Sequence, residues 1–429
     1  MSVEHLEILR LGQRGEGVAE ASVGTVYLPF TLPGDVVAAQ FDNGTLQGVD
    51  VVVPRADRLA PVCPYFGTCG GCAVQALPAE PYRAWKQDLV ADALRKAGLP
   101  AVATPLVEAH GAGRRRATFH SRLQPTPNVL RAPAVKTGFM RARSHDLIDI
   151  AACPVLAPEL DGALPAARRI AEALQNVGKP LDIVVTATDT GLDVDLRGLG
   201  PLQDSDRRRL ALMAAELDLA RLSNHGDVVL ERRSPSLRIG VASLVPPPGA
   251  FLQAAARGEA ALGDVVMAAV GGARKVADLF CGVGTFALRL ATVASVVAVD
   301  LEGPGLAALS RAARLAPGLK AVSTEARDLF RRPLHVDELA AFEAVVFDPP
   351  RAGALAQAEA LAASAVPVVV AVSCNPVTFA RDAAVLVGGG YSLERVVPVD
   401  QFLFASHVEM VGVFRRPKAT TRPKRRLFG

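Results

Sequence analysis

The chain has 429 residues, of which 50% are hydrophobic and 5% aromatic, and its net charge is +4. This length exceeds one ordinary domain, and the hydrophobic share excludes a disordered chain. The apolar runs are too short for a membrane span, and the N-terminus carries acids where a signal peptide needs cations. We therefore expect a cytoplasmic monomer with no membrane partner, whose six cysteines are ligands or catalysts rather than disulfides.

Short apolar runs alternate with glycine turns over residues 3–57, for example at 25–30 and 34–37. This pattern predicts a small β-barrel of about five strands. Barrels of this size often bind single-stranded nucleic acid, but they also serve as structural appendages. The pattern alone therefore leaves the role of this segment open.

Three cysteines lie within ten residues at Cys63, Cys69 and Cys72, and a fourth, Cys153, stands far downstream before a proline. Zinc sites usually show two cysteine pairs with short internal spacing. Three clustered cysteines and one distant Cys-Pro are more typical of iron–sulfur ligation. The spacing favours an iron–sulfur cluster, with zinc or structural thiols as the alternatives.

A helical pattern follows at 80–99, and residues 109–145 then contain no Asp or Glu. A stretch with one sign of charge favours a polyanionic partner, here RNA, over a basic surface that only aids solubility. The candidate RNA contacts in it are Arg114, Arg115, Arg116, Phe139, Arg141 and Arg143.

A proline-rich linker at 245–249 precedes repeated strand–loop–helix patterns, which predict a doubly wound α/β domain. A strand at 276–279 leads into a glycine loop around Gly282, and the next strand ends at Asp300. This arrangement predicts a cofactor site, and a nicotinamide enzyme is one interpretation. A second strand-end acid, Asp348 in Asp-Pro-Pro-Arg, favours a methyltransferase that acts on nucleobases.

A buried strand is predicted at 365–372, and it ends in Ser-Cys-Asn-Pro, which places Cys374 at a strand end. Ligands of open α/β sheets bind at such ends, so this thiol is a candidate nucleophile. The alternative is a structural cysteine. Cys281, in the glycine loop, is interpreted as a packing residue.

The glycine loop, Asp-Pro-Pro-Arg, Ser-Cys-Asn-Pro and the cysteine pattern occur together and in order. Together they resemble the S-adenosylmethionine-dependent RNA uracil-5 methyltransferases, in particular the iron–sulfur-containing 23S rRNA branch. The resemblance implies an α/β protein with a Rossmann-like methyltransferase domain at 246–416. It also implies a TRAM-type RNA-binding barrel at 1–57, a central α+β iron–sulfur domain at 58–245 and a basic tail at 417–429. A helix within 80–105 would pack on the catalytic domain.

The resemblance also assigns residues. It implies that Cys374 is the nucleophile and Glu409 the general base, and that the four cysteines named above hold a [4Fe-4S] cluster. The implied S-adenosylmethionine contacts are Gln253, Phe280, Gly282, Thr285, Asp300, Asp328 and Asp348. The chain departs from the family pattern at Ala255, Thr285 and Asp300, where many members have Asn, Asn and Glu.

The chemistry follows from the weakness of uracil carbon 5 as a nucleophile. Addition of the Cys374 thiolate to carbon 6 turns the ring into an enolate that accepts a methyl group at carbon 5. Glu409 then removes the carbon 5 proton. We expect a 23S rRNA uridine as substrate. The alternatives are the same reaction on transfer RNA, or a non-catalytic iron–sulfur RNA-binding protein.

Overall fold

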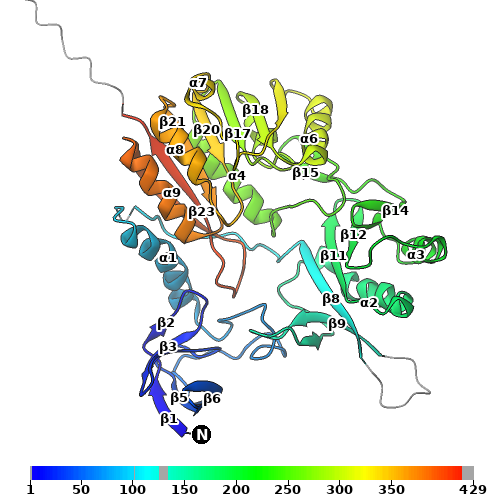
Figure 1. Ribbon diagram of the computed structural model, residues 1–429, viewed down its shortest axis with the longest axis vertical. Helices are drawn as coiled ribbons and strands as arrows, with labels where there is room; N and C mark the ends of the chain where they lie inside the picture. Colours follow the sequence, from blue (N-terminus) through cyan, green and yellow to red (C-terminus); the bar gives the residue numbers. More distant parts are fainter. Residues whose placement is uncertain (1, 101, 125–133, 418–429) are drawn as a thin grey trace, which may run out of the picture.

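The computed structural model describes residues 2–100, 102–124 and 134–417. The chain forms an N-terminal part, a central part and a C-terminal part, which meet around helix α1 and strand β8 (Figure 1). No helix in these ranges is long and apolar enough to cross a membrane. The predicted basic tail lies outside the described residues from position 418 onward.

The N-terminal part consists of six strands in two three-stranded antiparallel sheets, ordered β1-β5-β6 and β2-β3-β4. The strands are β1 (Ser2–Glu7), β2 (Arg10–Leu11), β3 (Gly17–Ala21), β4 (Gly24–Leu28), β5 (Val36–Asp42) and β6 (Thr45–Val53). Their core contains Leu6, Ile8, Leu28, Val37 and Phe41. The glycine turns of the sequence thus separate short strands that share one small apolar core.

Helix α1 (Ala79–Lys96) joins the N-terminal part to the C-terminal sheet. The indole Nε1 of Trp85 donates a hydrogen bond to the carbonyl of Gly12 at 3.2 Å. On the other side, Val90 and Leu94 enter the core of the C-terminal part. After the helix, β7 (Val107–Glu108) pairs in parallel with the edge of the C-terminal sheet.

The central part contains a seven-stranded sheet, ordered β10-β9-β8-β11-β12-β13-β14. Its strands are β8 (Arg116–Gln124), β9 (Ala134–Met140), β10 (Leu147–Asp149), β11 (Leu181–Thr188), β12 (Gly191–Arg197), β13 (Arg221–Asn224) and β14 (Asp227–Glu231). Its helices are η1 (Pro158–Leu160), α2 (Ala163–Ala173), η2 (Gln175–Val177) and α3 (Asp204–Glu216). Helices α2 and α3 cover the sheet over a core built around Phe119, Ile170 and Ile183.

The C-terminal part has an eight-stranded sheet, ordered β19-β18-β17-β20-β21-β23-β22-β7. Its own strands are β17 (Lys275–Leu279), β18 (Ser295–Asp300), β19 (Val322–Ala326), β20 (Ala344–Phe347), β21 (Val368–Ser373), β22 (Ser392–Asp400) and β23 (Glu409–Arg415). A hairpin of β15 (Leu237–Ile239) and β16 (Ala242–Leu244) precedes them. Strands β17 to β21 are parallel, and β23 lies antiparallel between β21 and β22.

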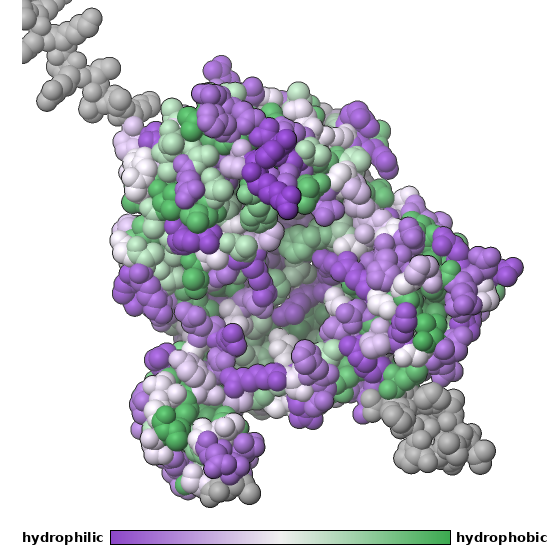
Figure 2. Space-filling view, viewed as in Figure 1, coloured by the Kyte–Doolittle hydropathy of each residue, from purple (hydrophilic) through white to green (hydrophobic). Residues whose placement is uncertain are grey.

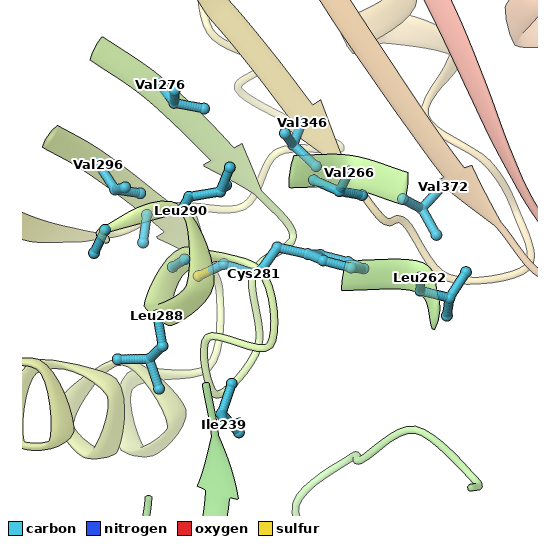
Figure 3. Packing of buried hydrophobic residues seen from close by; sticks show 14 of the residues in the cluster. Ile239, Leu262, Val266, Val276, Cys281, Leu288, Leu290, Val296, Val346 and Val372 are labelled. Carbon is cyan, nitrogen blue, oxygen red and sulfur yellow. The ribbon is translucent and has the colours of Figure 1, made fainter. Parts of the chain in front are cut away.

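The helices of this part are α4 (Ala256–Val270), α5 (Ala287–Leu290), α6 (Gly303–Leu315), α7 (Val336–Leu339), α8 (Leu355–Ala363) and α9 (Pro376–Gly388). They enclose two apolar cores, one on each face of the sheet. Cys281 is 6% exposed and lies among Leu288, Leu290 and Val296 in the first core (Figure 3). The predicted α/β fold with a doubly wound, mostly parallel sheet is therefore confirmed.

Candidate active site

Cys374 and Glu409 lie at facing ends of two paired strands. Strand β21 is buried along its whole length and pairs antiparallel with β23. The last pair of this ladder is Ser373 with Met410. Cys374 and Glu409 each lie one residue beyond that pair, so the fold brings together the two residues that were predicted to act together.

Glu409 is buried at 5% exposure, although it begins its strand. Burial raises the pKa of its carboxyl to about 7, while a hydrogen bond from Gln401 and the charges of Arg351 and Lys86 oppose the rise. A carboxylate whose pKa lies near 7 is suited to accept a proton at neutral pH. Strand β23 lies between β21 and β22, so neighbouring strands cover both of its edges, which explains why Glu409 is buried.

Cys374 lines a pocket of about 310 Å³ together with Arg351, Asn375, His407 and, from the N-terminal part, Arg14. Burial raises the pKa of the thiol to about 11, and the nearby acids Glu409 and Asp348 raise it further. Arg351 opposes them. It is therefore the cation that favours the thiolate.

The loop of Arg351 is held in place by the turn after Cys374. The Nδ2 of Asn375 donates to the Arg351 carbonyl at 3.0 Å, and its Oδ1 accepts from the Val377 N–H at 3.1 Å. The guanidinium lies 3.3 Å from Nε2 of His407. Burial and the neighbouring Arg351 lower the pKa of His407 to about 4, so this ring is neutral at pH 7. The face in Figure 2 is hollowed where the parts of the molecule meet.

Asp348 and Gln253 lie close to Cys374 and Glu409. Asp348 directly follows strand β20, and its Oδ2 accepts a hydrogen bond of 3.4 Å from Nε2 of Gln253. Burial raises the pKa of Asp348 well above its usual range, and the charge of Glu409 raises it further. The two predicted cofactor contacts therefore touch each other, and Asp348 is close enough to Cys374 to raise the pKa of its thiol.

The glycine loop after β17 has a left-handed backbone at Phe280 (φ 58°), Gly282 (φ 53°) and Gly284 (φ 95°). A Cβ on Gly284 would lie 2.4 Å from Leu309, so only glycine allows this close approach. Asp300 accepts a hydrogen bond from the Gly282 N–H at 2.8 Å. The loop therefore folds back over the end of strand β18.

Asp278 lies beneath this loop as a fully buried carboxyl. Neither of its oxygens has a hydrogen-bond partner within the described ranges. Burial raises the pKa of Asp278 to about 8, which outweighs the favourable orientation of the Ala287 backbone N–H. Such an orphaned acid fits a cationic ligand, and S-adenosylmethionine carries both a sulfonium and an ammonium group.

The remaining predicted cofactor contacts lie around the same loop. Thr285 is half-buried directly after Gly284. Asp328 follows strand β19 and accepts a hydrogen bond from the Phe330 N–H at 3.0 Å. The rings of Phe280 and Phe330 are 5.4 Å apart. The ends of β17, β18, β19 and β20 thus surround one site, as expected of an open α/β sheet.

The four predicted ligand cysteines line one cavity of about 440 Å³, and all its lining residues lie between positions 63 and 156. Four arginines and no acid share its lining: Arg114, Arg116, Arg141 and Arg143. Burial raises the pKa of Cys153 to about 11, and the charges of Cys72 and Cys63 add to the rise. Across the described part of the chain, no three His, Cys, Asp or Glu side chains are arranged around a single metal ion.

Two of the predicted RNA contacts are engaged inside the protein. Arg115 is 8% exposed, with a 2.5 Å ion pair to Glu259 and a hydrogen bond to the Gln253 carbonyl. Its prediction as an RNA contact is wrong, because its charge is already paired in the interior. Phe139 stacks on Phe119 at 5.5 Å and lines the cysteine cavity.

Sequence reasoning missed several residues of the site. Gln401 and Lys86 are buried and lie far apart in the chain, so no local motif indicated them. Arg351 belongs to the Asp-Pro-Pro-Arg motif and His407 lies two residues before Glu409, but neither was assigned a role. The one signal that could have indicated a site residue was the polar pair Asp400 and Gln401, which follows the apolar run 396–399.

Residues 248–417 match the family model described as tRNA (uracil-5-)-methyltransferase. An uncharacterized RNA methyltransferase of Brucella suis is 46% identical over 96% of this chain and 97% of its own length. A 23S rRNA (uracil(1939)-C(5))-methyltransferase of Pseudomonas syringae is 34% identical over 97% of this chain and 94% of its own length. The chain belongs to the RNA uracil-5 methyltransferase family.

The fold of a solved relative agrees with this membership. The tRNA (uracil-54, C5)-methyltransferase of Pyrococcus abyssi, solved with S-adenosyl-L-homocysteine, aligns with a TM-score of 0.70 at 21% identity. The alignment covers 96% of this chain and all of that one. As a member of the RNA uracil-5 methyltransferases, this protein is an enzyme that uses S-adenosylmethionine to methylate uracil in RNA.

Proposed function

We propose that this methyltransferase modifies carbon 5 of a uridine in ribosomal RNA, with Cys374 as nucleophile and Glu409 as general base. The observation that carries the proposal is the position of the two side chains at facing strand ends, where Asp348 lies close to both. The relative named as a 23S rRNA methyltransferase is 34% identical to this chain and the transfer RNA methyltransferase of known structure 21%, which favours ribosomal over transfer RNA.

The residues perform two covalent steps. The Sγ of Cys374 adds to carbon 6, and the electron pair of the carbon 5–carbon 6 double bond moves onto the ring as an enolate. Bound S-adenosylmethionine supplies the methyl group to carbon 5. Glu409 then takes the carbon 5 proton, the C–H electron pair restores the double bond, and the carbon 6–sulfur bond breaks to release the thiolate.

We also infer how the RNA approaches. Arg14, from the loop between β2 and β3, lines the Cys374 pocket, and a second pocket that includes Arg14 continues to Arg10, Lys96 and Arg143. Cationic side chains along such a track attract phosphates. This supports residues 1–57 as a TRAM-type RNA-binding unit. We also propose that residues 58–245 form the central iron–sulfur domain and residues 246–416 the catalytic domain. The target uridine must leave any base stack to reach the thiol.

The cysteine cavity supports a [4Fe-4S] cluster held by Cys63, Cys69, Cys72 and Cys153. Four thiolates give the site negative charge, and four arginines with no acid around them would compensate it. Zinc sites usually have two cysteine pairs with short internal spacing, whereas here three cysteines are clustered and the fourth is distant. Iron and sulfide analysis of anaerobically purified protein tests this, and stoichiometric zinc would overturn it.

The substrate is tested with radioactive S-adenosylmethionine and purified RNA. We expect label in 5-methyluridine of 23S rRNA from a strain that lacks this enzyme, and little label in transfer RNA. Mass spectrometry of nuclease fragments identifies the position. Labelling of transfer RNA alone would overturn the choice of ribosomal RNA but leave the chemistry intact.

A further inference from the structure

Gln401 connects the proposed base to the proposed cofactor contacts. It follows the last residue of β22 and is 1% exposed. Its Nε2 donates to Oε1 of Gln253 at 2.7 Å and to Oε1 of Glu409 at 3.2 Å. A single amide therefore touches two residues of the site that come from different elements.

The direction of this amide is fixed by chemistry as well as by its position. Its Oε1 accepts a hydrogen bond from the backbone N–H of Ala255 at 3.2 Å, and a backbone N–H can only donate. The carboxylate of Glu409 can only accept. With oxygen facing Ala255 and nitrogen facing Glu409, Gln401 cannot rotate its amide by 180° without losing both bonds.

The orientation passes on to Gln253. Because Oε1 of Gln253 accepts from Gln401, its Nε2 is directed to the other side, where Oδ2 of Asp348 lies at 3.4 Å. The hydrogen-bond chain thus runs in one direction from Ala255 through Gln401 and Gln253 to Asp348, with a branch to Glu409. The amide nitrogen of Gln401 uses its two N–H groups for two acceptors, one on Gln253 and one on Glu409.

The surroundings leave Gln401 little freedom. Helix α4 passes so close that a Cβ on Gly258 would lie 2.6 Å from the Cβ of Gln401. The preceding residue, Asp400, is fully buried and receives hydrogen bonds from Lys86 and Tyr82. A side chain enclosed in this way keeps one rotamer.

We propose that Gln401 is a positioning residue, which sets the direction of the Glu409 carboxylate and the Gln253 amide for removal of the carbon 5 proton. The inference rests on the proposed function. With Oε1 engaged by Gln401, the Oε2 of Glu409 is the oxygen that takes the proton. The C–H electron pair becomes the second bond between carbon 5 and carbon 6, and the carbon 6–sulfur bond breaks with its electron pair going to the sulfur of Cys374.

The test compares Gln401→Met and Gln401→Glu with wild-type enzyme. Methionine keeps the volume but donates nothing, so the Glu409 carboxylate loses a bond that favours its ionised form. We expect turnover to fall by about ten- to a hundredfold and the acidic limb of its pH profile to move up by about one unit. Covalent enzyme–RNA adduct should accumulate while its initial rate of formation stays unchanged. Gln401→Glu adds a like charge and should shift the limb further.

Gln357 provides the matched control, because it is also 1% exposed and bonds both backbone groups of Leu334 far from the site. Gln357→Met should lower the melting temperature and leave the pH profile in place. If Gln401→Met reduces turnover with the wild-type pH profile and no added adduct, its role is only structural and the inference is overturned. Wild-type enzyme that forms no adduct and no 5-methyluridine would instead overturn the proposed function.

Discussion

Nζ of Lys86 lies 2.9 Å from Oδ1 of Asp400, and both side chains are fully buried. Lys86 also donates to the carbonyls of Phe402 and His407, and Tyr82 donates to the other carboxylate oxygen. Side chains from one turn of α1 therefore form hydrogen bonds with both ends of the loop between β22 and β23. This is the loop that holds Gln401 and leads into Glu409.

Substitution of Lys86 by methionine should destabilise the protein by about 3–5 kcal/mol, because the Asp400 carboxylate would remain buried without its cation. Turnover should also fall, since the loop loses three bonds. Denaturant unfolding and methylation rates measure the two effects. The exposed Lys96 of the same helix is the control, and Lys96→Met should change the free energy of unfolding by less than about 0.5 kcal/mol. Equal stabilities of the two variants would contradict the role of this ion pair.

The two cysteines of the catalytic domain should respond in opposite ways. Cys374→Ala removes the nucleophile, so we expect loss of both methyl transfer and covalent adduct, with binding of S-adenosylmethionine retained. Cys281 is part of the apolar core, and Cys281→Ala should lower stability by about 1 kcal/mol and still form the adduct. Gel analysis of RNA adducts and calorimetry of cofactor binding measure these outcomes. Adduct formation by Cys374→Ala would refute its assignment.

Much of the fold was predictable because its signals are local. The strands that end at Asp300, Asp348 and Cys374 are continuous apolar runs, and parallel strands align their carboxyl ends by geometry. Three strand-end residues from separate motifs therefore had to lie at one edge of the sheet. The position of Glu409 was less certain from sequence, and its burial became clear only once β23 was found between two other strands.

Other features depend on contacts that no sequence period records. The bond between Lys86 and Asp400 joins residues 314 positions apart. Gln401 and Gln253 are 148 positions apart. Arg115 belonged to a one-signed basic stretch, yet its partner Glu259 comes from helix α4 of another part. Local charge pattern predicted a surface, and tertiary pairing decided otherwise.

The pH dependence should report Glu409. Its pKa of about 7 means that the carboxylate is protonated below that pH and cannot accept the carbon 5 proton. We expect turnover to fall about tenfold for each pH unit below this value. The adduct of wild-type enzyme should therefore break down more slowly at pH 6 than at pH 8, and the adduct of Glu409→Gln should break down slowly at every pH.

Rapid quenching at a series of pH values separates adduct formation from adduct breakdown. The inflection near pH 7 should occur in the rate of adduct breakdown and should vanish in Glu409→Gln. The rate of adduct formation should instead rise with pH, because it depends on the Cys374 thiolate. A pH-7 inflection that persists in Glu409→Gln would assign it to another group.

Asp278 offers a test of how stability and binding oppose each other. The pKa of its carboxyl is about 8 in the folded protein and about 3.9 in an unfolded chain. Between these pH values the folded state keeps a proton that the unfolded state has lost, so the protein loses stability as the pH rises. Asp278→Asn removes this loss. The variant without cofactor should therefore be more stable than wild type, and by more at pH 8 than at pH 5. Asparagine cannot carry the negative charge that a bound cation would favour on Asp278, so above pH 8 S-adenosylmethionine should bind at least about tenfold more weakly. Thermal unfolding at both pH values and calorimetric titration measure the two effects, and tighter cofactor binding by Asp278→Asn would contradict this role for the buried acid.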